Sequence, residues 1–252
     1  MIVFSGFVRV ATGSDEYALA EGVTVLSDAY DQWDRTGFYS SIVLFDRVLS
    51  NDSDNARALY WKGTALFFIS LHYLYSRERK ADQTEGIKTV KQGILMLSKA
   101  IHNDPLFSES YALRGVLRGM RIQLNPWTAV AQGPRVFKDR AKALQLNEQN
   151  PRVHFLTGVS FWYAPQILGS KKDALEHFLK AAKLFGSVTP ITADPTSPRW
   201  GHSMCLAFIG DYYSEQHDTI QARDYYEQSL AVNPKDPLAI KGLNKLNQQQ
   251  ER

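Results

Sequence analysis

The sequence holds few residues whose types and spacing could carry out chemistry. Its six histidines stand singly, none in the His-Glu-x-x-His spacing of a zinc-binding helix, and a single cysteine, Cys205, rules out a Cys-x-x-Cys pair. No Gly-x-x-x-x-Gly-Lys-Ser/Thr phosphate loop and no Gly-x-Ser-x-Gly nucleophile turn is present. Cys205 lies among apolar residues, so we expect a buried structural thiol. We therefore predict that the protein is not an enzyme and holds neither a metal nor a cofactor.

Three arginines form the clearest charged pattern. Arg114, Arg118 and Arg121 are spaced by four and three residues, which places them on one face of a helix. Such a face could attract a phosphate, a carboxylate cluster or an acidic peptide, so the three are candidate anion-binding residues. The opposite face, with Leu113 and Leu117, is apolar, and amphipathic helices normally turn their charges toward water. We favour this second interpretation, in which the arginines are the solvated side of the helix.

Length and composition favour a folded globular or repeat protein. The chain has 252 residues, of which 44% are apolar and 22% are charged, so it can bury a sizeable core. It carries 29 Lys and Arg against 26 Asp and Glu, and a net charge of +3 is too small to indicate nucleic acid. No run reaches the ~18 apolar residues that a membrane span needs. The expected partner is another protein or peptide, or a second copy of the chain in a homo-oligomer.

The amino-terminal sequence bears on the compartment. Residues 1–10, MIVFSGFVRV, are apolar but lack the basic lead and the Ala-x-Ala-like cleavage site of a signal peptide. The sequence as written therefore predicts a cytoplasmic protein, and a periplasmic one if an export signal lies upstream of the given start. The stretch MIVFSGF could also tuck into a groove or mediate self-association.

Helical periodicity and prolines indicate the architecture. Prolines at 105, 151 and 234 follow Asp or Asn and mark helix boundaries. One run places small residues where two helices would approach closely and bulky residues around them: Leu206-x2-Ile209-Gly210-x2-Tyr213-x8-Ala222-x3-Tyr226-x2-Ser229-x4-Pro234. This spacing resembles the tetratricopeptide repeat, a helix-turn-helix unit of about 34 residues. The resemblance implies an all-α, right-handed tetratricopeptide-like solenoid.

Further units keep parts of this pattern, so about five helical hairpins are expected. Second-helix halves are Ser41-x3-Phe45-x2-Val48, Gly93-x3-Leu97-x2-Ala100 and Ala174-x3-Phe178-x2-Ala181. Gly63 and Gly158 mark the partner helices of the last two. The remaining unit, around Gly115, is expected to be interrupted at Pro134, because proline removes a helical hydrogen bond.

A narrower resemblance covers residues 110–200. Its motifs are Tyr111-Ala112-Leu113-Arg114-Gly115, Arg121-Ile122-Gln123-Leu124-Asn125-Pro126, Asn150-Pro151-Arg152, Tyr163-Ala164-Pro165 and Pro198-Arg199-Trp200-Gly201. They resemble an uncharacterised Bacteroidetes/Chlorobi group of tetratricopeptide proteins. The group has no agreed activity and its members usually carry an export signal, so the resemblance implies the fold and no particular function.

The repeats divide the chain into an amino-terminal segment (1–14), a tetratricopeptide-like helical repeat domain (15–236) and a carboxy-terminal capping helix with a polar tail (237–252). In such a solenoid the first helix of each hairpin lines a concave groove. Counting from the glycine of each first helix predicts the residues that face this groove, which are candidate partner-binding residues: Arg57, Tyr60, Thr64, Phe67, Glu109, Val116, Arg152, Phe155, Val159, Trp162, Met204 and Asp211.

Aromatic side chains with a few charges suit an extended or helical peptide. We therefore predict a scaffold or adaptor that binds a partner protein in an open groove. The alternative is a carrier that holds a small molecule or lipid tail in an enclosed groove plugged by the 186–199 loop. A structural interpretation stands beside both, because Phe67, Phe155 and Trp162 could simply pack between helices.

Overall fold

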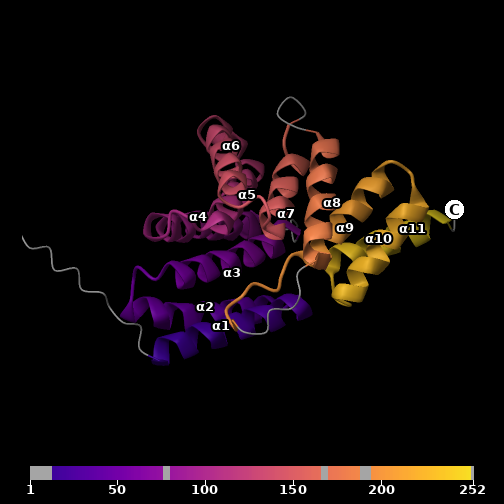
Figure 1. The fold of residues 1–252 in the computed structure, drawn as a ribbon. Coiled ribbons are helices and arrows are strands. Elements are labelled where there is room, and N and C mark those ends of the chain that lie inside the picture. The colour runs from indigo at the N-terminus through magenta and orange to yellow at the C-terminus, as the bar shows by residue number, and fades with distance from the viewer. Residues whose placement is uncertain (1–12, 76–79, 166–169, 188–193, 251–252) are drawn as a thin grey trace, which may run out of the picture.

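A computed structural model describes residues 13–75, 80–165, 170–187 and 194–250, and this part of the chain is all-α (Figure 1). Its helices are α1 (Gly13–Gln32), α2 (Arg35–Asn51), α3 (Ala56–Tyr75), α4 (Lys80–Asn103), α5 (Ser108–Leu124), α6 (Ala129–Leu146), α7 (Pro151–Trp162), α8 (Lys171–Ser187), α9 (His202–Glu215), α10 (Thr219–Val232) and α11 (Pro237–Gln250), with a 3₁₀ turn, η1 (Pro126–Thr128), before α6. The all-α prediction is confirmed. No helix in the described ranges is long and apolar enough to cross a membrane, and the stretch MIVFSGF lies outside these ranges.

Within the described ranges, the helices pair in chain order as five hairpins. α1 packs with α2, α3 with α4, α5 with α6, α7 with α8, and α9 with α10 (Figure 1). The last helix, α11, packs against both α9 and α10 at the carboxy-terminal end of the stack. This arrangement is the tetratricopeptide-like solenoid that the repeats predict.

Each hairpin is held by a close approach between a glycine of its first helix and one side chain of its second. The pairs are Gly22 with Phe45, Gly63 with Leu97, Gly115 with Asp139, Gly158 with Phe178, and Gly210 with Tyr226. A Cβ added to Gly158 would lie 2.5 Å from the Phe178 ring, so these two helices can approach only because that side chain is missing. The partner is large in four hairpins, and in the third it is a carboxylate.

The ends of the helices follow from local side-chain chemistry. Asp34 and Asn150 accept hydrogen bonds from the first backbone N–H groups of α2 and α7. The expected interruption at Pro134 is wrong, because α6 runs continuously through it. The residue before the proline is Gly133, which has no Cβ to meet the proline ring, so the helical conformation is tolerated there.

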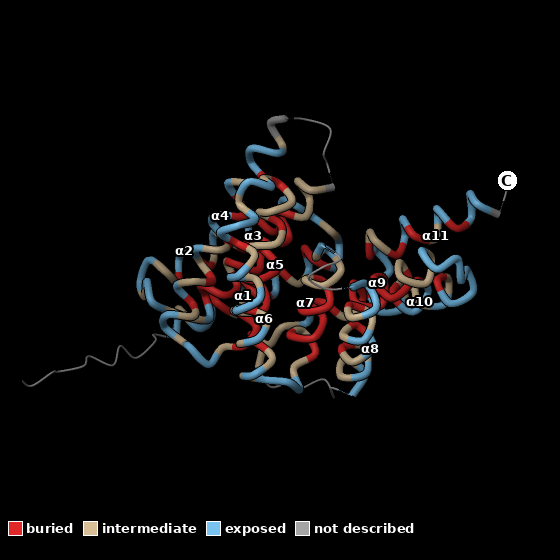
Figure 2. The backbone as a smooth tube through the Cα atoms, turned by 90° about the horizontal axis from the view of Figure 1, so that it is seen from above, coloured by how far each residue is buried: buried red, intermediate tan, exposed pale blue. Residues whose placement is uncertain are grey.

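The first and last hairpins meet across the concave side of the solenoid. The Tyr30 hydroxyl, near the end of α1, lies 2.8 Å from Ser203 Oγ at the start of α9, and it accepts the Gly201 N–H at 3.3 Å. Lys235 donates to the side chain of Gln32 from the loop before α11. Figure 2 shows the buried residues concentrated along the inner helices α3, α5, α7 and α9. The core therefore lies behind the concave face.

Candidate functional site

One half of the predicted groove is occupied by the chain's own polar side chains. The carboxylate of Glu109, near the start of α5, accepts from Arg152 Nε at 3.0 Å and from Asn150 Nδ2 at 2.8 Å. Tyr60, near the start of α3, donates its hydroxyl to the same carboxylate. Thr64 is buried one turn further along α3. These residues come from the amino-terminal halves of the inner helices, and they bond to each other.

The described end of the 186–199 loop, with Trp200 after it, fills the space next to this polar cluster. Trp200 is only 2% exposed, and its ring lies 5.6 to 6.5 Å from the rings of Phe67, Phe68 and Phe155. Asp194 accepts from Arg57 at 2.8 Å at the outer edge. The part of the 186–199 loop that the structure describes therefore lies over this half of the groove. Trp200, the residue after the loop, fills the space between the groove's aromatic side chains.

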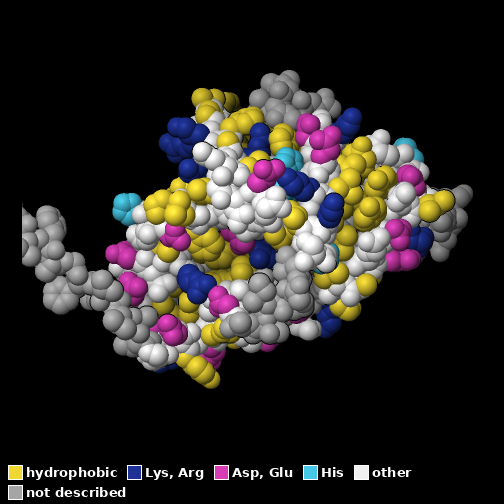
Figure 3. Space-filling view, viewed as in Figure 1, with side chains coloured by type: hydrophobic (Ala, Val, Ile, Leu, Met, Phe, Trp, Pro, Cys, Tyr) yellow, Lys and Arg dark blue, Asp and Glu magenta, His cyan; other side chains and the backbone are white. Residues whose placement is uncertain are grey.

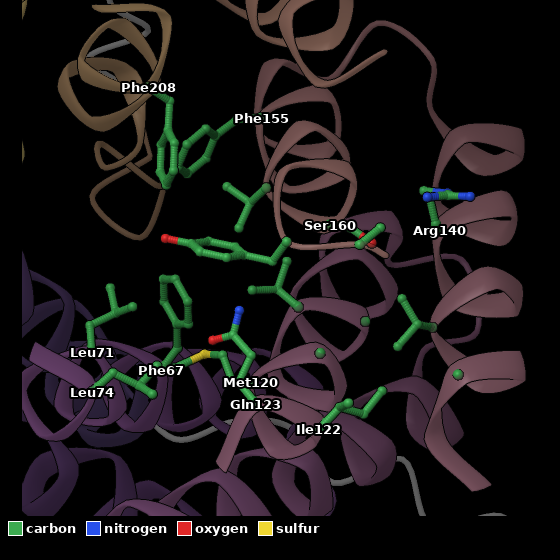
Figure 4. Close-up of a pocket in the computed structure, with 18 of the residues that line it drawn as sticks. Phe67, Leu71, Leu74, Met120, Ile122, Gln123, Arg140, Phe155, Ser160 and Phe208 are labelled. Atoms are coloured by element: carbon green, nitrogen blue, oxygen red, sulfur yellow. The ribbon is translucent and has the colours of Figure 1, made fainter. Parts of the chain in front are cut away.

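The other half of the concave face holds a pocket with a volume of about 470 Å³ (Figure 4). Its walls come from α3, α5, α6, α7 and α9, with further contributions from the residues just after α7 and from Lys241 of α11. Most lining side chains are apolar: Phe67, Leu71, Leu74, Val116, Met120, Ile122, Val136, Phe137, Phe155, Val159, Met204 and Phe208. Five predicted groove residues are among them, namely Phe67, Val116, Phe155, Val159 and Met204. Phe67 and Phe155 are also core residues, so the structural interpretation of these two holds as well.

Two further residues predicted to face the groove, Trp162 and Asp211, do not line the pocket. The Trp162 ring packs against Phe178 and Phe208, with Lys171 Nζ 4.4 Å from its centroid, and it is not among the side chains that line the pocket. Asp211 accepts the Tyr226 hydroxyl at 2.7 Å between α9 and α10. Burial raises the pKa of Asp211 to about 6. Both side chains serve packing between helices.

The pocket has a small set of polar groups, including Gln123, Arg140, Ser160 and Lys241. The guanidinium carbon of Arg140 lies 3.8 Å from the Phe161 ring centroid, and burial lowers the pKa of this group. Within the described residues no carboxylate comes within 4.0 Å of Arg140. The Ser160 hydroxyl is buried and has no hydrogen-bond partner in the part of the chain that the structure describes.

Part of the pocket wall is bare backbone. Gly119 of α5 and Gly133 of α6 line it, together with Gly115, whose Cβ position is covered by Asp139. A Cβ built at Gly119 or Gly133 would meet no atom within 4 Å, whereas the glycines that hold the hairpins together are tightly covered. A flat or slender molecule can therefore approach the main chain here.

The solvated-side interpretation of the arginines is wrong for Arg114 and Arg118. Both guanidinium groups are largely buried and donate to Asp139 of α6, at 2.6 Å and 2.5 Å. Asp139 is itself only 3% exposed, so its charge is shared between the two arginines. The missed signal is Asp139, which occupies the position where the other hairpins have Phe, Leu or Tyr. A carboxylate at an interior position predicts internal cationic partners.

A histidine pair was also missed, since each histidine appears isolated in the sequence. His154 Nδ1 of α7 lies 3.0 Å from His177 Nδ1 of α8. His154 Nε2 lies 2.8 Å from the Glu148 carbonyl, which can only accept, so His177 is the donor within the pair. Burial, with the charges nearby, lowers the pKa of His177 to about 4. No group of three His, Cys, Asp or Glu in the described part of the chain could hold a metal ion.

Cys205 agrees with its expected structural role. The side chain is fully buried on α9, and its thiol donates to the Phe178 carbonyl at 3.2 Å. Burial raises the pKa of the thiol well above its ordinary value, which keeps it protonated and unreactive.

Solved structures with a similar fold include two that cover most of the chain. The HusA haemophore from Porphyromonas gingivalis is 22% identical, with 82% of this chain and 96% of that chain covered and a TM-score of 0.64. The tetratricopeptide protein TTC0263 from Thermus thermophilus is 14% identical, with coverages of 92% and 98% and a TM-score of 0.65. No protein-family model and no curated protein matches the chain. These likenesses show the tetratricopeptide-like fold, and the narrower Bacteroidetes/Chlorobi resemblance stays a prediction.

Proposed function

We propose that this protein is a non-catalytic carrier that binds an apolar small molecule on its concave face. The observation that supports this is the pocket of about 470 Å³, which falls within the roughly 300–1,000 Å³ range of ligand sites. The scaffold function predicted from the sequence needs a continuous open groove, and Trp200 with the polar cluster fills half of that surface. What remains is shaped for a compact ligand.

The walls support a preformed site. Phe67 and Phe155 pack against Trp200 on one side and line the pocket on the other, so the core itself holds their rings in place. A site that needs no ordering on binding loses little conformational entropy, which favours affinity for a small ligand.

The likeness to a haemophore supports a planar, apolar cargo as the first class to test. No histidine or cysteine is among the described side chains that line the pocket, and Met120, Met204 and Tyr163 are the residues there with atoms that could approach an iron. We therefore expect the apolar body of the ligand to supply most of the affinity. Haem and metal-free protoporphyrin should then bind with similar dissociation constants.

The experiment fills the pocket without disturbing the fold. Gly119→Leu places a side chain in open space, because a Cβ at this position meets nothing within 4 Å. Gly186→Leu is the matched control, since Gly186 of α8 is equally uncrowded and is not among the pocket's lining residues. Titrations with Nile red and protoporphyrin should show at least tenfold weaker binding to Gly119→Leu than to Gly186→Leu. Equal binding by the two variants would rule out this pocket as the site.

A second candidate is the protein scaffold, supported by the mouth of the pocket. Tyr163 and Phe137 line the pocket and are 50% and 36% exposed, so the apolar anchor of a peptide could enter past them. A stoichiometric protein that is captured by Gly186→Leu and lost with Gly119→Leu would favour the scaffold. If both variants bind dyes differently but retain the same proteins, the carrier function stands alone.

A further inference from the structure

We propose that Arg140 and Ser160 form the acid-recognising end of the pocket, so that the ligand is an apolar molecule carrying a carboxylate. This inference rests on the proposed carrier function and adds the chemical class of its ligand. Figure 4 shows the two residues on one side of the pocket and Phe67, Phe155 and Phe208 on the other. An amphipathic acid would lie with its body among these rings and its head at Arg140.

Two aromatic rings, those of Phe137 and Phe161, pack against the guanidinium group of Arg140. Its central carbon lies 3.8 Å from the Phe161 centroid and 4.7 Å from the Phe137 centroid. Contacts with ring faces orient a guanidinium while leaving its N–H donors available, and two of those donors match a carboxylate in a bidentate pair.

Arg140 differs from three other partly buried arginines, Arg114, Arg118 and Arg152, each of which has a carboxylate partner. Arg114 and Arg118 share the carboxylate of Asp139, and Arg152 is paired with Glu109. Asp173 acts on Arg140 electrostatically, but the two form no ion pair within 4.0 Å in the described part of the chain. A partly buried cation without a contacting carboxylate is costly, and an anionic ligand would remove that cost.

The Ser160 hydroxyl supplies an independent observation. A serine inside a helix commonly donates to the carbonyl one turn earlier, as Ser70 and Ser98 do. Among the described residues, the buried Ser160 hydroxyl has no hydrogen-bond partner, although Ser160 lines the pocket. Rotation about its Cα–Cβ bond would present this donor to the pocket, where a carboxylate oxygen at Arg140 could accept it.

A carboxylate fits this site better than a phosphate group. The site offers one guanidinium and one hydroxyl within a largely apolar wall, which together satisfy the two oxygens of a single negative charge. A phosphate monoester carries close to two charges and three acceptor oxygens, and it needs more donors than these residues provide.

The test compares 1-pyrenebutyrate with its methyl ester, which share one planar apolar body and differ in charge. Arg140→Met keeps the apolar stem and removes the charge, and Arg140→Lys keeps the charge. Arg135→Met is the matched control, an exposed arginine of α6 that does not line the pocket. Figure 3 shows Lys and Arg side chains gathered around α6, so the control also reports any general effect of surface charge.

We expect the wild type and Arg135→Met to bind the acid about tenfold more tightly than the ester. Arg140→Met should lose this preference by weakening the acid alone, and Arg140→Lys should keep part of it. Ser160→Ala should weaken the acid about threefold and leave the ester unchanged. Melting curves on all variants establish that each is folded.

The proposal is overturned if acid and ester bind the wild type equally, or if Arg140→Met and Arg135→Met weaken the acid by the same factor. It is also overturned if Nile red binds the wild type and the acid does not. If Nile red, the acid and the ester all fail to bind, the carrier function itself fails, and that result is distinct from the loss of acid preference.

Discussion

The two halves of the concave face differ in that one is filled by the chain's own residues and the other holds an open pocket. At the amino-terminal ends of the inner helices, Tyr60, Glu109 and Arg152 bond to each other beneath Trp200. In the other half, aromatic and aliphatic residues of the inner helices and of α6 surround an open pocket. The difference lies in whether another segment of the chain reaches that part of the face. Helical periodicity identifies which residues face the concave surface. Contacts between residues far apart in the sequence determine which part of that surface is left uncovered and open to a ligand.

The first prediction tests how strongly the filled half depends on its plug. Trp200→Ala should lower the free energy of unfolding by about 3–5 kcal/mol, because it empties a site that is packed against Phe67, Phe68 and Phe155. Denaturant unfolding measures the loss. The control is Tyr163→Ala, a half-exposed pocket residue, which should cost less than about 1 kcal/mol.

Trp200→Ala should also create a cavity in the filled half of the concave face, so that this half could accept a small ligand as the pocket does. Apolar cavities created by truncation stay dry and accept small aromatic molecules. Added indole should therefore raise the melting temperature of Trp200→Ala and leave that of the wild type unchanged. Equal stability of Trp200→Ala and Tyr163→Ala would mean that both halves are open in solution.

The second prediction concerns the polar cluster of the filled half. Arg152→Ala leaves the buried Glu109 carboxylate without its cation, which should cost about 3 kcal/mol of stability. Arg57→Ala is the control, since its ion pair with Asp194 joins side chains that are 58% and 37% exposed and should contribute below about 1 kcal/mol. Chemical denaturation of the two variants compares them. If the two variants lost the same free energy of unfolding, the Glu109 cluster would be more accessible to water than its burial indicates.

Local patterns predicted the fold better than they predicted the site. The five hairpins follow from glycine and large-residue spacing, as in Gly210 with Tyr226, which lie close in sequence. Trp200 could not be placed in the same way, because its position depends on contacts such as Tyr30 with Ser203, which are 173 residues apart. Five of the residues predicted from periodicity to face the groove line the pocket, and their role in binding stays a prediction. Arg140 was missed because it lies on α6, the second helix of its hairpin, whereas only the first helices were expected to line the groove.

The third prediction concerns pH and the His154–His177 pair, which packs α7 against α8 outside the pocket. The pKa of His177 is about 4 in the folded chain, below its ordinary value of 6.5, so the unfolded chain binds this proton more tightly. The stability it contributes is complete above pH 6.5 and is lost as the pH falls toward 4. The melting temperature should therefore fall less steeply over this range in His177→Asn than in the wild type.

Asp211 provides a control of opposite sign in the same pH window. Its pKa is raised to about 6, so on acidification the folded chain takes up this proton before the unfolded chain does and is stabilised. Asp211→Asn should remove that compensation and make the acid-induced fall steeper. Parallel pH profiles for the wild type and His177→Asn would show that the pair does not carry the acid sensitivity.

The smallest expected effect separates the two kinds of glycine. Gly119→Ala should raise the free energy of unfolding by about 0.5–1 kcal/mol, because alanine favours the helix and its Cβ meets only open space. Gly158→Ala should lower it, because the same atom would lie 2.5 Å from the Phe178 ring. Thermal and denaturant unfolding of the two variants gives the signs. A loss of stability in Gly119→Ala would mean that protein atoms fill the space beside α5 in solution, and the two halves of the concave face would then be packed alike.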